Sequence, residues 1–188
     1  MSDLDIITRI RLEHAQAVEG VFTNHVGDIT KLAAKMAAAV KANHKLLFCG
    51  NGGSACDAMH IAGEFVGRFV HDRKALPAIA LTSDSGIITA VANDYAYEDI
   101  FSRQVEALGQ AGDVLISMST SGKSPNVLKA IAAAKAKNIF TVLLTGEKGK
   151  DSKDADMTIV VPSTVTAHIQ EAHITVLHSL ASLVESRL

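Results

Sequence analysis

Apolar residues recur at helical spacing over the first part of the chain, from residue 5 to about residue 24 and from residue 29 to 43. Gly27 and Asp28 lie between these two stretches. Glycine often ends a helix and aspartate often caps the next one, so the pair indicates a break. The pattern predicts a hairpin of two antiparallel helices over residues 5–43, approximately.

Five short apolar runs follow, at residues 45–49, 77–81, 113–118, 139–144 and 157–161. Helical patterns separate them, and a last amphipathic helix is expected from about Thr166 to the end. Strands that alternate with helices are typical of a doubly wound α/β fold, with a parallel sheet covered on both faces. We therefore expect a single domain over residues 1–188, made of the helical hairpin and an α/β core over about 45–188.

The composition limits the function classes. Hydrophobic residues make up 48% of the chain and aromatic residues only 4%, so Ala, Val, Ile and Leu must build the core. The net charge is -2 and the cationic residues form no basic run, which argues against a nucleic-acid partner. The absence of a leader-like segment and of about 18 consecutive apolar residues predicts a cytoplasmic protein with no membrane partner.

The two cysteines, Cys49 and Cys56, flank a glycine-rich loop and lack the spacing of a redox or metal-binding pair. We interpret both as small, reduced core residues. A catalytic thiol is the alternative, because a helix N-terminus can lower the pKa of a cysteine.

A hydroxyl-rich segment, residues 119–124, precedes the helix that Pro125 opens. Hydroxyls and free backbone N–H groups at a helix start attract anions, so we expect this segment to bind a phosphate group. The spacing is not that of a nucleotide-binding P-loop. The alternative is an ordinary turn in which Ser124 caps the helix.

The loop after the first apolar run, residues 50–55, matches the loose G-x-G-x-x-A form of a dinucleotide fingerprint, which is a weak signal. In the helix that follows, His60 and Glu64 lie four residues apart, and Arg68 lies four residues further on. All three should share one helix face, where His60 and Glu64 could bind a metal ion. A surface histidine beside a carboxylate is the alternative.

The last helix carries His168, Gln170, Glu171, His173 and His178 among apolar residues. By spacing alone, Gln170 pairs best with His173. Gln170 and His178 are about 12 Å apart along the helix axis, so they could bind one metal only by straddling it or from different subunits.

Six segments in the same order resemble the sedoheptulose 7-phosphate isomerase (phosphoheptose isomerase) family of SIS-domain proteins, over essentially the whole chain. They are Phe48-Cys49-Gly50-Asn51-Gly52-Gly53-Ser54, Asp57-Ala58-Met59-His60, Ala92-Asn93-Asp94-Tyr95, Ile100-Phe101-Ser102-Arg103, Ser119-Thr120-Ser121-Gly122 and Ile169-Gln170-Glu171-Ala172-His173.

The resemblance implies a flavodoxin-like SIS fold, a homotetramer and the conversion of sedoheptulose 7-phosphate to D-glycero-D-manno-heptose 7-phosphate in bacterial heptose biosynthesis. It implies one Zn²⁺ per subunit, held at His60, Glu64, Gln170 and His178, and so prefers His178 to His173. The substrate-binding positions that it implies are Asn51, Gly52, Gly53, Glu64, Arg68, Asn93, Asp94, Ser119, Thr120, Ser121, Ser124 and Gln170.

An aldose–ketose isomerase needs a base and an acid to move protons, and we assign these roles to Glu64 and His178. A rival hypothesis is a non-catalytic SIS-fold binding protein, like the bacterial factors that associate with the replication initiator. Those relatives lack residues of the Glu64 and His178 type, and this chain has both. The chain departs from the family pattern at Thr166-Ala167-His168 and at Ser85-Gly86, which bears on substrate preference.

Overall fold

The five apolar runs form one sheet in which all strands are parallel. In the computed structural model, which describes residues 1–188, the strand order is β2-β1-β3-β4-β5. The strands are β1 (Leu46–Gly50), β2 (Ala78–Ala80), β3 (Val114–Ser119), β4 (Phe140–Gly146) and β5 (Met157–Val161). The α-helices are α1 (Asp3–Lys41), α2 (Gly53–Val66), α3 (Ser85–Asp94), α4 (Ser102–Leu108), α5 (Pro125–Ala136) and α6 (Thr166–Glu185), and two 3₁₀ helices are η1 (Tyr97–Asp99) and η2 (Glu147–Gly149). The predicted α/β fold with a five-stranded parallel sheet is confirmed.

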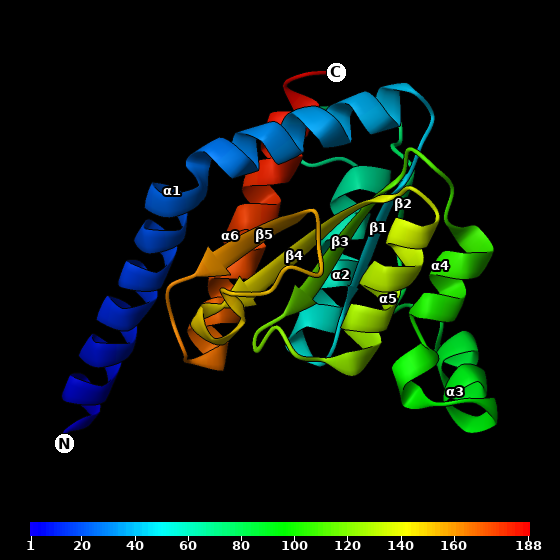
Figure 1. Ribbon diagram of the computed structural model, residues 1–188. Coiled ribbons are helices and arrows are strands. Elements are labelled where there is room, and N and C mark those ends of the chain that lie inside the picture. Colours follow the sequence, from blue (N-terminus) through cyan, green and yellow to red (C-terminus); the bar gives the residue numbers. More distant parts are fainter.

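Helices cover both faces of this sheet, as Figure 1 shows. Successive residues of a strand point to opposite faces, so Leu46 and Phe48 pack toward α1, α2 and α6, while Leu47 and Cys49 pack toward α4 and α5. All four side chains are fully buried. Burial on both faces explains why the strands are continuous apolar runs rather than alternating ones.

The predicted helical hairpin is wrong, because α1 is one continuous helix of 39 residues. Glycine in a helix costs only about 1 kcal/mol, so Gly27 does not force a break. Asp28 does not cap a second helix; its carboxylate lies 3.1 Å from Nδ1 of His25. His25 Nε2 in turn accepts a hydrogen bond from the backbone N–H of Val160 on the edge strand β5. This contact fixes the middle of α1 against the sheet.

The first turns of α1 extend beyond the rest of the chain (Figure 1), and most of their side chains are exposed. Leu4 and Ile7 are 71% and 63% exposed. Buried residues begin with Ala17, and the second half of the helix packs on β5 and α6. The chain therefore leaves the large apolar side chains of residues 3–16 exposed, and we call this segment the apolar arm.

The cysteine interpretation is half right. Cys49 is buried in β1, and burial raises the pKa of its thiol to about 12, which removes it as a nucleophile at neutral pH. Cys56 is exposed on α2 and is not a core residue. Considered by length and hydropathy, none of the helices would be able to pass through a lipid bilayer.

Candidate active site

The candidate site lies at the point of the sheet where the strand order changes direction. From β1 the chain moves outward to β2, and β3 then lies on the other side of β1. Gly50 at the end of β1 is in register with Met118 near the end of β3. The loops that follow these two strands therefore diverge from neighbouring points, which is where doubly wound sheets bind ligands.

The first of these loops is held by a pair of amides. Asn51 and Asn126 each donate to the other's side-chain oxygen, at 2.9 and 2.8 Å, and the hydroxyl of Tyr97 donates to Asn51 at 3.2 Å. Gly52 has a φ of +57°, a conformation that favours glycine. Asn126 and Tyr97 were not predicted from the sequence, although only Pro125 separates Asn126 from the expected anion-binding segment.

The second loop, residues 119–124, brings its hydroxyls together. The Oγ atoms of Ser119 and Ser124 lie 2.9 Å apart, and Gly122 adopts a φ of +69°. Several of its backbone N–H groups are not free, contrary to expectation: those of Gly122, Lys123 and Ser124 all donate within the loop. Ser124 precedes α5 but its side chain does not cap it. An anion would therefore be bound mainly by side-chain hydroxyls.

Three further residues form a compact group on two neighbouring helices. His60 and Glu64 lie one turn apart on α2, with 3.2 Å between His60 Nε2 and Glu64 Oε1. His178 on α6 places its Nε2 3.3 Å from the same nitrogen of His60. The His60 side chain is half exposed, so this His60–Glu64–His178 triad opens to solvent. The structure thus brings together three of the four expected metal ligands.

The geometry of the triad fits a metal ion. A tetrahedral zinc site with bonds of about 2.0–2.1 Å separates its ligand atoms by roughly 3.3 Å. The contacts of 3.2 and 3.3 Å at His60 are close to that value. The ligand atoms of His60, Glu64 and His178 all lie within 4.8 Å of one another. Two nitrogens and one oxygen are a donor set that suits zinc and similar cations.

Electrostatics favour the neutral imidazole at His178. Burial lowers the pKa of His178, and the neighbouring His60 lowers it further, against an opposing effect of Glu64. Asp57 lies one turn before His60 on α2, and burial raises the pKa of its carboxyl group. Its Oδ2 atom is buried without a hydrogen-bond partner. Asp57 is a polar group beside the triad to which the sequence assigned no role.

The segment after α2 supports the triad from one side. The helix ends at Val66, and Arg73 binds the carbonyl oxygens of Glu64 and Phe65 in its last turn, at 2.8 and 2.9 Å. Arg73 is in turn paired with Glu185, whose carboxylate accepts the backbone N–H groups of residues 69–71. This arrangement holds the ring of Phe69 stacked on His178, with 5.4 Å between centroids.

The remaining predicted positions are more scattered. Arg68 lies in the segment after α2, is exposed, and donates to the carbonyl of Val70. Asn93 and Asp94 are exposed at the end of α3 and are hydrogen-bonded to each other. Contacts between α3 and η1 connect this pair to Tyr97, and through Tyr97 to Asn51.

Gln170 does not join the triad within one chain. Its side chain lies over Gly53, so close that a Cβ at that position would be 2.7–2.8 Å from its amide atoms. Gly53 starts α2, seven residues before His60, which is roughly 10 Å along the helix. The alternative pairing partner, His173, is buried with no hydrogen bond to either ring nitrogen. It faces the core and is not placed to bind a metal with Gln170.

Comparison with known proteins identifies relatives of this chain. The SIS domain family matches residues 12–146. Phosphoheptose isomerase from Burkholderia pseudomallei (strain 1710b) is 52% identical over 158 residues, which cover 84% of this chain and 80% of that protein. Two solved phosphoheptose isomerases superpose closely. The one from Neisseria gonorrhoeae has a TM-score of 0.90 and 38% identity, covering 98% of this chain and 100% of that one. The one from Francisella tularensis has a TM-score of 0.92 and 35% identity, covering 99% and 100%.

Proposed function

This chain belongs to the SIS domain family and, within it, to the phosphoheptose isomerases, and from that premise we propose how its own residues carry out the isomerisation. It is an isomerase of heptose biosynthesis. The reaction we assign is the conversion of sedoheptulose 7-phosphate to D-glycero-D-manno-heptose 7-phosphate. The observation that carries the assignment is the His60–Glu64–His178 triad, which combines metal donors with proton-transfer groups.

The triad supports a metal-dependent reaction. We propose one Zn²⁺ per subunit, held by His60, Glu64 and His178. Gln170 of the same chain lies over Gly53, so a ligand role for Gln170 requires a neighbouring copy. A bound metal ion supplies a Lewis acid that polarises the sugar carbonyl and stabilises negative charge on its oxygen.

Two proton transfers convert the ketose to the aldose. One moves a proton between C1 and C2 through an enediol, and the other exchanges a proton between the two oxygens. Glu64 has a second carboxylate oxygen that does not face His60, and this oxygen is the group we assign to the carbon proton. Nε2 of His178 faces the metal site, so the neutral ring carries its proton on Nδ1, from where it is able to donate that proton to one sugar oxygen and recover one from the other.

The second part of the proposal concerns phosphate binding by residues 119–124, which we call the hydroxyl loop. Ser119 ends β3, and Thr120, Ser121 and Ser124 follow it, beside the loop that begins at Asn51 and at the switch point of the sheet. Binding the phosphate there would hold the distant end of the sugar and so keep C1 and C2 in register with the proton-transfer groups. The sugar chain would then run from residues 119–124 toward α2 and α6.

Incubating the purified protein with sedoheptulose 7-phosphate in D₂O tests the function directly. A new aldose phosphate should be seen by NMR, with deuterium incorporated at C2 because the carbon proton passes through the enzyme. Specific binding of the sugar phosphate without any aldose product or exchange would support the non-catalytic class of SIS-fold protein instead.

The same assay with unphosphorylated sedoheptulose tests the phosphate-binding loop. We expect poor turnover, because the hydroxyl loop then has no anion to hold. Ser119→Ala should lower kcat/KM for the phosphorylated sugar by about tenfold, since one hydrogen bond to a charged group contributes about 1.5 kcal/mol. Equal turnover of the two sugars would show that the loop does not bind phosphate.

The apolar arm supports an oligomer, and we propose the homotetramer. Leu4, Ile7 and Ile10 are exposed on α1, and an apolar surface of this kind marks a protein contact. The His60–Glu64–His178 triad is also open to solvent, as expected of a site that a second copy completes. Light scattering at micromolar concentration should give four times the 19.8 kDa mass of one chain. Leu4→Glu with Ile7→Glu should lower that mass, and Thr23→Glu, on the same helix, should not.

A further inference from the structure

A second group of metal-type side chains lies where α1 crosses α6, away from the triad. His14 on α1 and His168 on α6 both direct Nδ1 at the same carboxylate oxygen, Oε2 of Glu171, at 2.8 and 3.1 Å. The ligand atoms of the three residues all lie within 4.8 Å of one another. We call these three residues the α1–α6 cluster. His168 lies ten residues before His178, roughly 15 Å along the helix.

The spacing in this cluster is close to that of a metal site. The ligand atoms of a tetrahedral zinc are roughly 3.3 Å apart, so the two contacts to Glu171 need to lengthen by only a few tenths of an ångström. Without a metal, both imidazoles hold a proton against one oxygen. A cation would replace those two protons and give the shared oxygen a single, stronger partner.

The position of Glu13 is the second observation. Nε2 of His168 lies 3.3 Å from Oε2 of Glu13, while Nδ1 of the same ring faces Glu171. A metal-binding histidine typically donates a hydrogen bond from its other ring nitrogen to a carboxylate, and this bond fixes the tautomer and the orientation of the ring. The His168 side chain is only 5% exposed, so this orientation is locked by packing.

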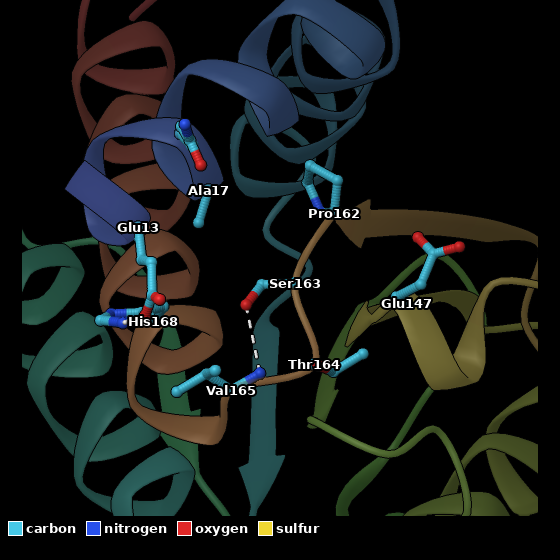
Figure 2. A pocket seen from close by; sticks show the side chains of 9 residues that line it. Glu13, Ala17, Glu147, Pro162, Ser163, Thr164, Val165 and His168 are labelled. Carbon is cyan, nitrogen blue, oxygen red and sulfur yellow. Dashed lines mark hydrogen bonds and ion pairs between the residues drawn. The ribbon is translucent and has the colours of Figure 1, made fainter. Parts of the chain in front are cut away.

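A cavity lies beside the cluster, on the side of Glu13 and His168. It has a volume of about 310 Å³ and is lined by Glu13, Gln16, Ser163, Thr164, Val165 and His168, among others. Figure 2 shows Glu13 and His168 next to each other at one side of it, with Pro162 and Glu147 at the other. His14 and Glu171 do not line the cavity, but their side chains are 43% and 45% exposed, so water can reach the cluster and supply a fourth ligand.

The charge of the cluster suits a cation. Hydrogen bonds from His168 and then His14 lower the pKa of Glu171, so it is a carboxylate at neutral pH. Two imidazoles and one carboxylate form a borderline donor set, which favours Zn²⁺, Co²⁺ or Ni²⁺ over Mg²⁺ or Ca²⁺.

We propose that His14, His168 and Glu171 bind a second divalent transition-metal ion, which clamps the start of α6 to the arm of α1. Within one chain the ion is structural rather than catalytic, because its two ligands on α6 lie about two and three turns from His178. It would fix the direction of an arm that the chain otherwise leaves uncovered.

Metal stoichiometry tests this proposal separately from the isomerase reaction. Metal-free full-length protein is titrated with Zn²⁺ by calorimetry, and the bound zinc is then measured after gel filtration. Wild type should bind two equivalents per chain. His14→Gln should bind one, His60→Gln should bind one, and the variant with both substitutions should bind none. His14 is partly exposed, so its replacement should leave folding intact.

The outcomes are distinguishable whatever happens at the triad. An equivalent of zinc that is lost in His14→Gln and kept in His60→Gln supports the proposal, even if wild type binds only that one. His14→Arg is a matched second variant, since it preserves an ion pair with Glu171 but cannot bind a metal. If all zinc is lost in His60→Gln, or if His14→Gln and His14→Arg bind as much zinc as wild type, the cluster is only an ion-pair network and the proposal is overturned.

Discussion

Glu64→Gln should lower isomerase turnover by about two to four orders of magnitude, the usual contribution of a general acid or base. The amide keeps the size of the carboxylate but can neither take up a proton nor carry the charge that a metal ion needs. Glu64 is partly exposed on α2 and its backbone carbonyl remains available to Arg73, so the fold should survive. Turnover is measured with sedoheptulose 7-phosphate, and metal content is measured on the same sample.

His178→Gln should cause a loss of similar size. This imidazole is the one that α6 places 3.3 Å from His60, with Phe69 stacked on its ring. The matched control is His173→Gln, on the same helix but facing the core. It should keep its metal and its turnover at a temperature where circular dichroism shows it folded. Loss of activity in His173→Gln with retention in His178→Gln would mean that the wrong histidine has been assigned.

A large effect on stability is also expected: acidification should destabilise the protein because His173 takes up a proton more readily in the unfolded chain. Burial lowers the pKa of His173 from 6.5 to about 4 in the folded state. Between these values the unfolded chain binds more protons, so the free energy of unfolding falls as the pH falls. The expected loss is about 2 kcal/mol between pH 7 and pH 5.

His173→Met tests this expectation. Methionine fills a similar volume and removes the titrating ring, so the unfolding free energy should change much less between pH 7 and pH 5. At pH 7 the variant should be at least as stable as wild type, because neither ring nitrogen of His173 has a hydrogen-bond partner to lose. Urea titrations at fixed protein concentration measure both values. An equal pH dependence in the two proteins would contradict the assignment to His173.

The strands were predictable because each is a largely apolar run between polar turns, as in β1, where all five residues are buried. The course of α1 was not. Gly27 and Asp28 form a reasonable helix break by local rules, and what overrides it is the contact of His25 with Val160, residues 135 positions apart. Local propensity could not show that the helix was anchored from outside.

The site residues likewise include some that local spacing predicts and others that depend on tertiary packing. The pair of His60 and Glu64 follows from helical spacing alone, and the structure places them 3.2 Å apart. His178 was assigned by resemblance, and spacing on α6 alone favoured His173. Only the packing of α6 against α2 decides which histidine faces His60. The contact between Asn51 and Asn126 depends likewise on β1 and β3 being neighbours, which the order of elements in the sequence does not reveal.

The packing of α1 against α6 has a consequence for biosynthesis of the chain. The first helix to leave the ribosome has its apolar face covered by the last one, so that face waits for nearly the entire chain to be translated. Contacts between such distant segments form late and slow folding, and the uncovered face is prone to aggregation meanwhile. Nascent chains that stop before α6 should therefore be the species that chaperones bind.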